Sequence, residues 1–291
     1  MRSTLIKLHT AVFLWGFTGV LGRLITLNAP LLVWYRILIT IITLTVILWI
    51  KGQLQKLPLK RMLQLFGVGV IVALHWVCFY GSIKYANVSI ALVCLSSAGL
   101  FTALLEPIFS KKKFNIKEFL LGFIGIAGIY LIFHFDPHYK TGIIIGLFAT
   151  IFSVIFTIFN KKVVTSIEPK TMMLYELSGG LISLTILMPF YLKAFPTLHL
   201  LPSITDWFWL ILMSWFCTVL AMDLSLQALK KVSAFTQNLT LNLEPVYGII
   251  LAFVVYHENK ELGTGFYFGF GLIILSVALQ MLRILKYKHV Y

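Results

Sequence analysis

A series of polar side chains recurs at helical spacing along one apolar segment, residues 233–256. Its members are Ser233, Thr236, Gln237, Thr240 and Glu244, with Asn238 and Asn242 beside them. Steps of three, four, seven and eleven residues place the first five on one face of a helix. These groups could hold a polar solute in a cavity by hydrogen bonds, or could join the helix to its neighbours. We favour the cavity lining. Pro245 follows directly, and a proline frees a backbone carbonyl within a helix, so it is a candidate hinge.

Ionisable side chains also occur inside other apolar segments, where each costs about 2.5–3.5 kcal/mol to insert. Arg36 could bind a carboxylate or phosphate through two parallel hydrogen bonds, pair with an internal acid, or extend to the membrane surface. Glu176 and Asp223, like Glu244, could carry a proton if burial favours their neutral form, or could belong to ion pairs. His75 could titrate near neutral pH, but a single histidine is more often hydrogen-bonded packing.

Three aromatic side chains, Trp15, Trp76 and Tyr80, could stack on a planar solute, although aromatic residues inside apolar helices more often pack against their neighbours. The candidate substrate-binding residues are therefore Glu244, Gln237, Asn238, Thr240, Trp15, Arg36, His75, Trp76 and Tyr80.

The composition explains what surrounds these residues. Of 291 residues, 59% are apolar and 12% are charged, whereas soluble domains carry about 25% charged residues. The mean hydropathy is +0.94. Because a helix needs about 20 apolar residues to cross a bilayer, the chain has room for roughly ten spans. The predicted segments are 5–26, 31–50, 62–83, 88–110, 117–135, 141–160, 171–192, 207–228, 233–256 and 263–284.

The net charge of +14 comes from residues between these segments. If alternate connections lie on opposite sides, eighteen Lys and Arg residues fall on the side of the termini and four on the other. Positive residues gather in cytoplasmic loops, so we expect both termini in the cytoplasm and an even number of spans. The charge is thus explained without a nucleic-acid partner. Cys78, Cys94 and Cys217 lie inside apolar segments, without the spacing of a disulfide framework or a metal site.

The chain contains a weak internal repeat. At an offset of 146 residues, Lys84–Val88 aligns with Lys230–Ala234 and Gly99 with Pro245, which makes Gly99 a second candidate hinge. Nearer the start of each half the offset falls to about 138–140. Five spans per copy is an odd number, so the second copy must be inserted upside down. Inverted repeats, here 5–135 and 141–284, are a transporter architecture with the site between them.

Signatures of other classes do not occur in the sequence. It has no His-Glu-x-x-His zinc motif, no Gly-x-Ser-x-Gly elbow and no phosphate-binding glycine loop, which argues against an enzyme or an ATP-driven pump. We expect neither a cofactor nor a metal.

Several motifs resemble one family. Leu14–Thr18 is similar to the Trp-Gly-Ser/Thr start of EamA-type drug/metabolite transporters, and Leu243–Val246 and His257–Gly263 resemble that family's Glu-Pro and Gly-Glu-x-Leu elements. Arg36 resembles the arginine of its second span. The resemblance covers both halves and implies a ten-helix carrier of small metabolites, often amino acids, that works by alternating access.

The first half departs from the family's pattern. Ala98 and Gly99 stand where the second half has Glu244 and Pro245, and a displaced Glu106-Pro107 follows. Lys112 and Lys113 replace the Gly-Glu element. The first half therefore cannot provide the polar groups that the second half provides.

Together these patterns predict an all-helical, multi-pass protein of the cell (inner) membrane, in contact with lipid. We expect spans 1, 3, 4, 6, 8 and 9 to surround a site for amino acids or related solutes, with export as one direction of transport. The alternatives are a lipid-carrier flippase subunit and a non-transporting sensor or scaffold. A homodimer through spans 5 and 10 would favour the sensor.

Overall fold

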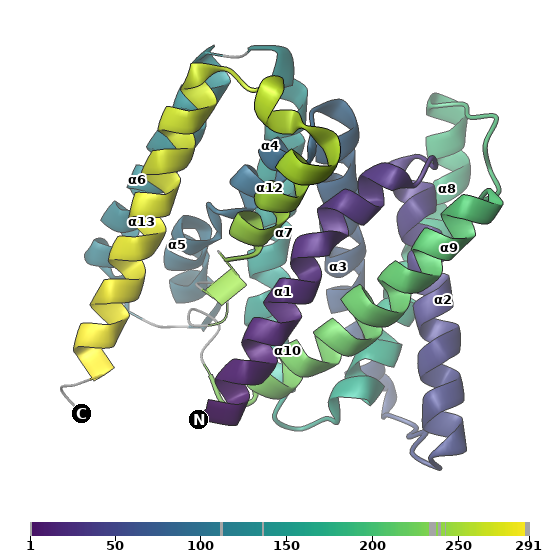
Figure 1. The fold of residues 1–291 in the computed structure, drawn as a ribbon. Coiled ribbons are helices and arrows are strands. Elements are labelled where there is room, and N and C mark those ends of the chain that lie inside the picture. The colour runs from purple at the N-terminus through teal and green to yellow at the C-terminus, as the bar shows by residue number, and fades with distance from the viewer. Residues whose placement is uncertain are drawn as a thin grey trace.

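The computed structural model describes residues 2–110, 113–135, 137–232, 237, 240–241 and 243–288, and within these ranges it is helical without any strand (Figure 1). The first half contains α1 (Arg2–Leu24), α2 (Ala29–Ile50), α3 (Leu59–Tyr85), α4 (Val88–Leu95), α5 (Ala98–Ser110) and α6 (Ile116–Phe135). The second half contains α7 (Lys140–Val163), α8 (Pro169–Ala194), α9 (Ile204–Leu212), α10 (Ala221–Leu229), α12 (Leu243–Tyr256) and α13 (Thr264–Lys288). Short 3₁₀ turns cover Pro137–Tyr139 and Glu258–Lys260.

Several helices begin where the sequence provides a cap. The Asn28 side chain accepts a hydrogen bond from the Leu31 amide at 3.1 Å, and Asn87 accepts one from the Ile90 amide at 2.8 Å. Glu168 caps α8 by accepting from the Thr171 amide at 3.0 Å. These side chains satisfy amides that have no partner within the helix, which fixes where each helix starts.

Seven helical segments in the described part of the chain are long and apolar enough to cross a membrane. Three shorter apolar helices, Phe119–Ile132, Leu243–Tyr256 and Thr264–Ser276, fall within the remaining predicted segments. The prediction of an all-helical membrane protein is confirmed, whereas the count of ten spans stays a prediction.

Two helical segments are less regular than the sequence predicts. The segment 88–110 is divided into α4 and α5, because Ser96 and Ser97 interrupt it and the Ser97 hydroxyl donates to the Cys94 carbonyl at 2.6 Å. Gly99 is the second residue of α5, and Pro245 lies in the first turn of α12. In the eighth segment, a π-helical stretch, Met213–Leu220, separates α9 from α10. Such stretches are rare and often occur at functional sites.

Equivalent helices of the two halves make equivalent contacts with the opposite half. Helix α1 packs on α10 and α12, and its equivalent α7 packs on α3 and α4. Helix α2 packs on α8, and α6 on α13. A Cβ atom at Gly128 of α6 would lie 2.4 Å from the Gly269 carbonyl oxygen of α13, and the reverse also holds. The absence of side chains at these two glycines therefore allows the α6 and α13 backbones to touch.

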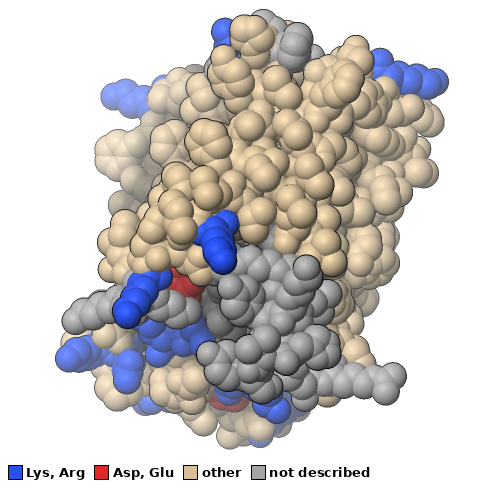
Figure 2. Space-filling model, turned by 90° about the vertical axis from the view of Figure 1, so that its left-hand side faces the viewer, with Lys and Arg blue, Asp and Glu red and all other residues tan. Residues whose placement is uncertain are grey.

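Helix α1 begins and α13 ends at the same end of the bundle, which we call the lower end as drawn in Figure 1. The linkers α8–α9 and α12–α13 lie at the upper end. Seen from the side of α6 and α13, the surface is mostly uncharged over its middle height, a few Lys and Arg side chains lie at the upper end, and more of them gather in the lower half (Figure 2). This distribution agrees with the charge asymmetry of the sequence.

Candidate functional site

A cavity lies between the two halves of the bundle. Its walls come from α1, α2, α3, α4, α5, α7, α10 and α12, together with Gln237 and Leu241. Of the candidate residues, it is lined by Trp15, Arg36, His75, Trp76, Gln237 and Glu244. Tyr80 and Thr240 are buried but do not line it, and Asn238 lies outside the described residues. The second span was not among the spans expected to surround the site, although Arg36, the residue through which α2 lines the cavity, was a candidate.

Arg36 is the main charged group at the upper part of this cavity. Its side chain is 1% exposed. Nε donates to the Thr218 hydroxyl at 2.8 Å, Nη1 to the Tyr80 hydroxyl at 2.6 Å and Nη2 to the Cys217 carbonyl at 3.3 Å. No carboxylate among the described residues forms an ion pair with it. The positive charge is therefore held in place by neutral groups and is not neutralised by them.

Aromatic rings surround the guanidinium group. Its carbon lies 4.0 Å from the centre of the Trp76 ring, a cation–π contact. Trp15 donates through Nε1 to the Cys217 carbonyl at 2.9 Å, so one carbonyl oxygen accepts from both Trp15 and Arg36. Cys217 belongs to the π-helical stretch, whose wider turn makes this carbonyl available. Hydropathy gave no signal for this stretch, which is why the sequence did not indicate Cys217 and Thr218.

Tyr80 and His75 have different positions in the site. The Tyr80 hydroxyl, besides accepting from Arg36, donates to the Met213 sulfur at 3.2 Å and so supports the arginine from outside the cavity. His75 faces the cavity and is anchored by Nδ1, which lies 2.8 Å from the Ala149 carbonyl oxygen. Because a carbonyl only accepts, Nδ1 must donate, and Nε2 is the nitrogen left for a solute.

Buried polar atoms without a partner are found along the cavity wall. They are the Thr18 hydroxyl oxygen, the Asn160 Oδ1 and the Gln237 Oε1. The Gln237 amide nitrogen donates to the Ser225 hydroxyl at 3.0 Å. Buried polar groups nearly always have partners in native proteins, so these atoms, which have none among the described residues, are free to bond to a polar molecule in the cavity. Asn160 and Ser225 were not predicted, although each is a polar residue in an apolar segment.

The other two acids lie away from the cavity wall. Glu176 is 0% exposed. Its Oε2 accepts from the side-chain nitrogen of Asn160 at 3.5 Å, and its Oε1 has no partner among the described residues. Asp223 forms an ion pair with Lys170, with 2.5 Å between Oδ2 and Nζ. Only Glu176 of these two therefore connects to the cavity, through Asn160.

The fold and this cavity describe a helical membrane protein with a cavity between its halves. The model of the EamA-like transporter family matches residues 2–134 and 140–282. The chain belongs to this family of membrane transporters in the drug/metabolite superfamily, whose members are transporters and not enzymes. A comparison with curated proteins finds no significant match.

Solved structures share the fold. One, described only as "Crystal structure of protein", is similar over 97% of this chain and 97% of its own, with a TM-score of 0.69 and 14% identity. At this identity the similarity extends to the fold alone. The fold therefore recurs in a protein whose sequence is very different.

Proposed function

We propose that the protein is a secondary transporter that moves a small metabolite through the central cavity by alternating access. The observation that carries this proposal is Arg36, a buried cation on the wall of a cavity between the two halves, which forms no direct ion pair with a carboxylate among the described residues. A buried charge that no carboxylate contacts directly is costly, and inside a membrane-spanning helix it often marks a substrate pathway.

The cavity favours a solute with a carboxylate and a hydrogen-bond donor. A guanidinium group has five N–H donors, and the neutral partners of Arg36 occupy three of them. The remaining two suit one carboxylate oxygen each. Glu244 faces the same cavity and could accept from an amino group, and Trp15 and Trp76 could contact a planar body. Amino acids and related solutes combine these features.

The packing of the halves supports an alternating-access cycle. We infer ten spans in two inverted repeats, 5–135 and 141–284, because α1 packs on α10 and α12 as its equivalent α7 packs on α3 and α4, and because the equivalent helices α2 and α8, and α6 and α13, pack on each other. In this arrangement the lower end is cytoplasmic and the membrane is the cell (inner) membrane, as the charge asymmetry indicates. The large exposed side chains on α6 and α13, such as Phe123 and Phe268, suit contact with lipid as well as with a second copy of the protein. A homodimer through these helices therefore stays a prediction.

Among the acids, we propose Glu176 as the carrier of a coupled proton. Among the described residues its only polar partner is the side-chain amide of Asn160, and Asn160 lines the cavity. Asp223 is neutralised by Lys170, and Glu244 is better placed to contact the solute. A carboxyl group connected to the cavity can accept a proton and release it when the cavity is hydrated, which suits Glu176 to this role.

The test begins with purified protein and a library of metabolites. A ligand that binds only the folded state raises the unfolding temperature, and each hit is then followed by counterflow in proteoliposomes with either orientation of the gradient. A carboxylate-containing hit that Arg36→Lys abolishes would support the proposal. A hit that binds without counterflow would favour a sensor, and stabilisation by lipid-linked compounds only would favour a flippase.

The control variant for this test is Glu261→Gln, because Glu261 is exposed in the α12–α13 linker and distant in sequence from every cavity residue. It should bind and transport like the unmodified protein. If Arg36→Lys and Glu261→Gln behave alike, the assignment of Arg36 to the solute is wrong.

A further inference from the structure

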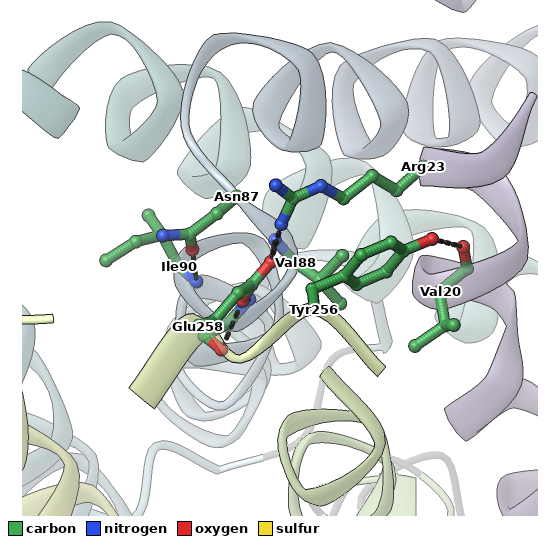
Figure 3. Close-up of polar contacts among 8 residues, drawn as sticks. Val20, Arg23, Asn87, Val88, Ile90, Tyr256 and Glu258 are labelled. Carbon is green, nitrogen blue, oxygen red and sulfur yellow. Dashed lines mark hydrogen bonds and ion pairs between the residues drawn. The ribbon is translucent and has the colours of Figure 1, made fainter. Parts of the chain in front are cut away.

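Glu258 is a buried acid at the upper end of the bundle, and it lies outside the cavity. It follows α12 and is 0% exposed, and one of its oxygens forms an ion pair with Arg23 of α1. The same carboxylate accepts hydrogen bonds from the Val88 amide at 3.0 Å, the Ser89 amide at 2.8 Å and the Ser89 hydroxyl at 2.5 Å (Figure 3). One side chain thus joins the end of α1, the start of α4 and the α12–α13 linker.

The surroundings of this carboxylate reinforce the connection. Arg23 lies over the Tyr256 ring, 4.4 Å from its centre, and the Tyr256 hydroxyl donates to the Val20 carbonyl at 2.8 Å (Figure 3). His257 adopts a left-handed backbone conformation, with φ of 56°, which turns the chain so that Glu258 points inward. A left-handed conformation is uncommon outside glycine and is maintained only where the surroundings fix it.

The cavity ends below this cluster but reaches the lower end of the bundle. Leu229 is the last residue of α10, at the lower end, and it lines the cavity. At the upper end the last lining residue of α1 is Thr18, six positions before the helix ends at Leu24. Six residues of helix correspond to about 9 Å. The side chains around Glu258 lie in this part of the bundle, between the cavity and the upper end.

The repeat offers a comparison with the lower end. At the offset of 146 residues, the position equivalent to Glu258 is Lys112, which lies outside the described residues. At the offset of 138, Arg23 corresponds to Lys161, whose Nζ donates to the Leu229 carbonyl at 2.7 Å and the Val232 carbonyl at 2.5 Å. A cation is thus present at both ends, but only the upper end has an acid at the Glu258 position.

We propose that Glu258 is a latch that closes the upper end of the transport pathway, and that its replacement by lysine in the first repeat makes the resting carrier favour the state open toward the lower end. This inference rests on the proposed alternating-access function. To open the upper end, the carrier must separate Arg23 from Glu258 and remove the carboxylate from the start of α4. A buried ion pair that loses one partner leaves an uncompensated charge, so this separation opposes upward opening. The lower end has no acid at the matching position to oppose opening.

The experiment measures the two ends of the protein separately. Spin-label pairs are introduced by Tyr85→Cys with Lys260→Cys at the upper end, and by Arg61→Cys with Lys231→Cys at the lower end. All four positions are exposed. The three native cysteines are replaced by alanine, and distances are measured by electron paramagnetic resonance in lipid nanodiscs.

Glu258→Gln should lengthen the upper distance and shorten the lower distance. We expect about a tenfold change in the ratio of the two populations, which corresponds to ~1.4 kcal/mol. Glu261→Gln, an acid in the same linker that is exposed, should change neither distance. If Glu258→Gln destabilises the fold too much, Arg23→Gln removes the ion pair and leaves the Val88 and Ser89 hydrogen bonds in place, and it should produce a smaller shift in the same direction.

Reciprocal changes at the two ends would support the latch. Unchanged distances in folded Glu258→Gln and Arg23→Gln would overturn it, and so would equal lengthening of both pairs, because a merely structural residue loosens the whole bundle. The readout needs no solute, so it separates the two proposals. A reciprocal shift in a protein that transports no tested metabolite supports the latch while the proposed transport fails.

Discussion

The hydroxyl oxygen of Tyr80 lies 2.6 Å from Nη1 of Arg36, yet only the arginine faces the cavity. The tyrosine fixes the guanidinium from behind, together with Thr218 and the Cys217 carbonyl. The arginine is therefore presented to the cavity in one orientation, with its remaining donors in place before a solute arrives. Such preorganisation lowers the entropy cost of binding.

Tyr80→Phe should weaken solute binding without abolishing it. The variant keeps the Arg36 charge but removes one hydrogen bond that orients it, and hydrogen bonds to charged groups contribute about 1.5–3 kcal/mol. We expect the dissociation constant of a carboxylate ligand to rise by about 10- to 100-fold, measured by titration calorimetry in detergent. Tyr85→Phe is the control, because Tyr85 is 59% exposed on the same helix. Equal affinities in the two variants would contradict the role given to Tyr80.

Glu244→Gln and Gln237→Ala should each reduce transport while the protein stays folded. Both side chains line the cavity, and the Gln237 Oε1 has no protein partner. Removing a group that contacts the solute should raise its half-saturating concentration about tenfold or more in a counterflow assay. Normal transport by both variants would show that this face of the ninth segment only joins helices, which is the alternative interpretation of its polar pattern.

Glu176→Gln should uncouple transport from a proton gradient. The glutamine preserves the hydrogen bond to Asn160 but cannot gain or lose a proton, so counterflow should continue while accumulation driven by a pH gradient is lost. The measurement is solute uptake into proteoliposomes with and without an imposed gradient. Asp223→Asn tests the competing assignment, since Asp223 is ion-paired with Lys170. If Glu176→Gln still accumulates solute with the gradient, Glu176 is not the coupling residue.

Gly69→Ala should destabilise the protein strongly. A Cβ atom at Gly69 of α3 would lie 1.6 Å from the Glu176 carbonyl oxygen of α8, so the two helices would have to separate. We expect the free energy of unfolding to fall by about 3 kcal/mol or more, because a backbone atom cannot rotate out of the way as a side chain can. Gly67→Ala is a matched control on the same helix, with nothing within 4 Å of the added atom. Thermal unfolding in detergent should separate the two variants clearly.

Hydropathy predicted where most helices begin and end, because an apolar stretch must be covered by lipid or protein wherever it lies. The caps at Asn28 and Asn87 fall close to the predicted boundaries. The interruption at Ser96 and Ser97 was not predicted, since two small polar residues scarcely change the hydropathy of a segment. The burial of Arg36 and Glu244 in one cavity also depends on which helices meet, and that information is not contained in the pattern of any single segment.

The limits of prediction are clearest around the cations. Arg36 was identified as unusual because it is a charged residue inside an apolar segment, but its neutral partners come from Tyr80, 44 positions away, and from the π-helical stretch more than 180 positions away. Arg23 was assigned no role in the sequence, because it is the next-to-last residue of α1 and resembles an ordinary residue at the membrane surface. Its contact with Glu258 bridges 235 positions.

The glycine contact between α6 and α13 has a consequence for how such carriers diversify. Among the described residues, neither helix lines the cavity, and the two backbones touch at Gly128 and Gly269. We therefore expect substitutions that change which solute is accepted to fall on the other helices and to leave this contact intact. The cavity could then evolve toward a new solute while the packing of α6 on α13 stays the same.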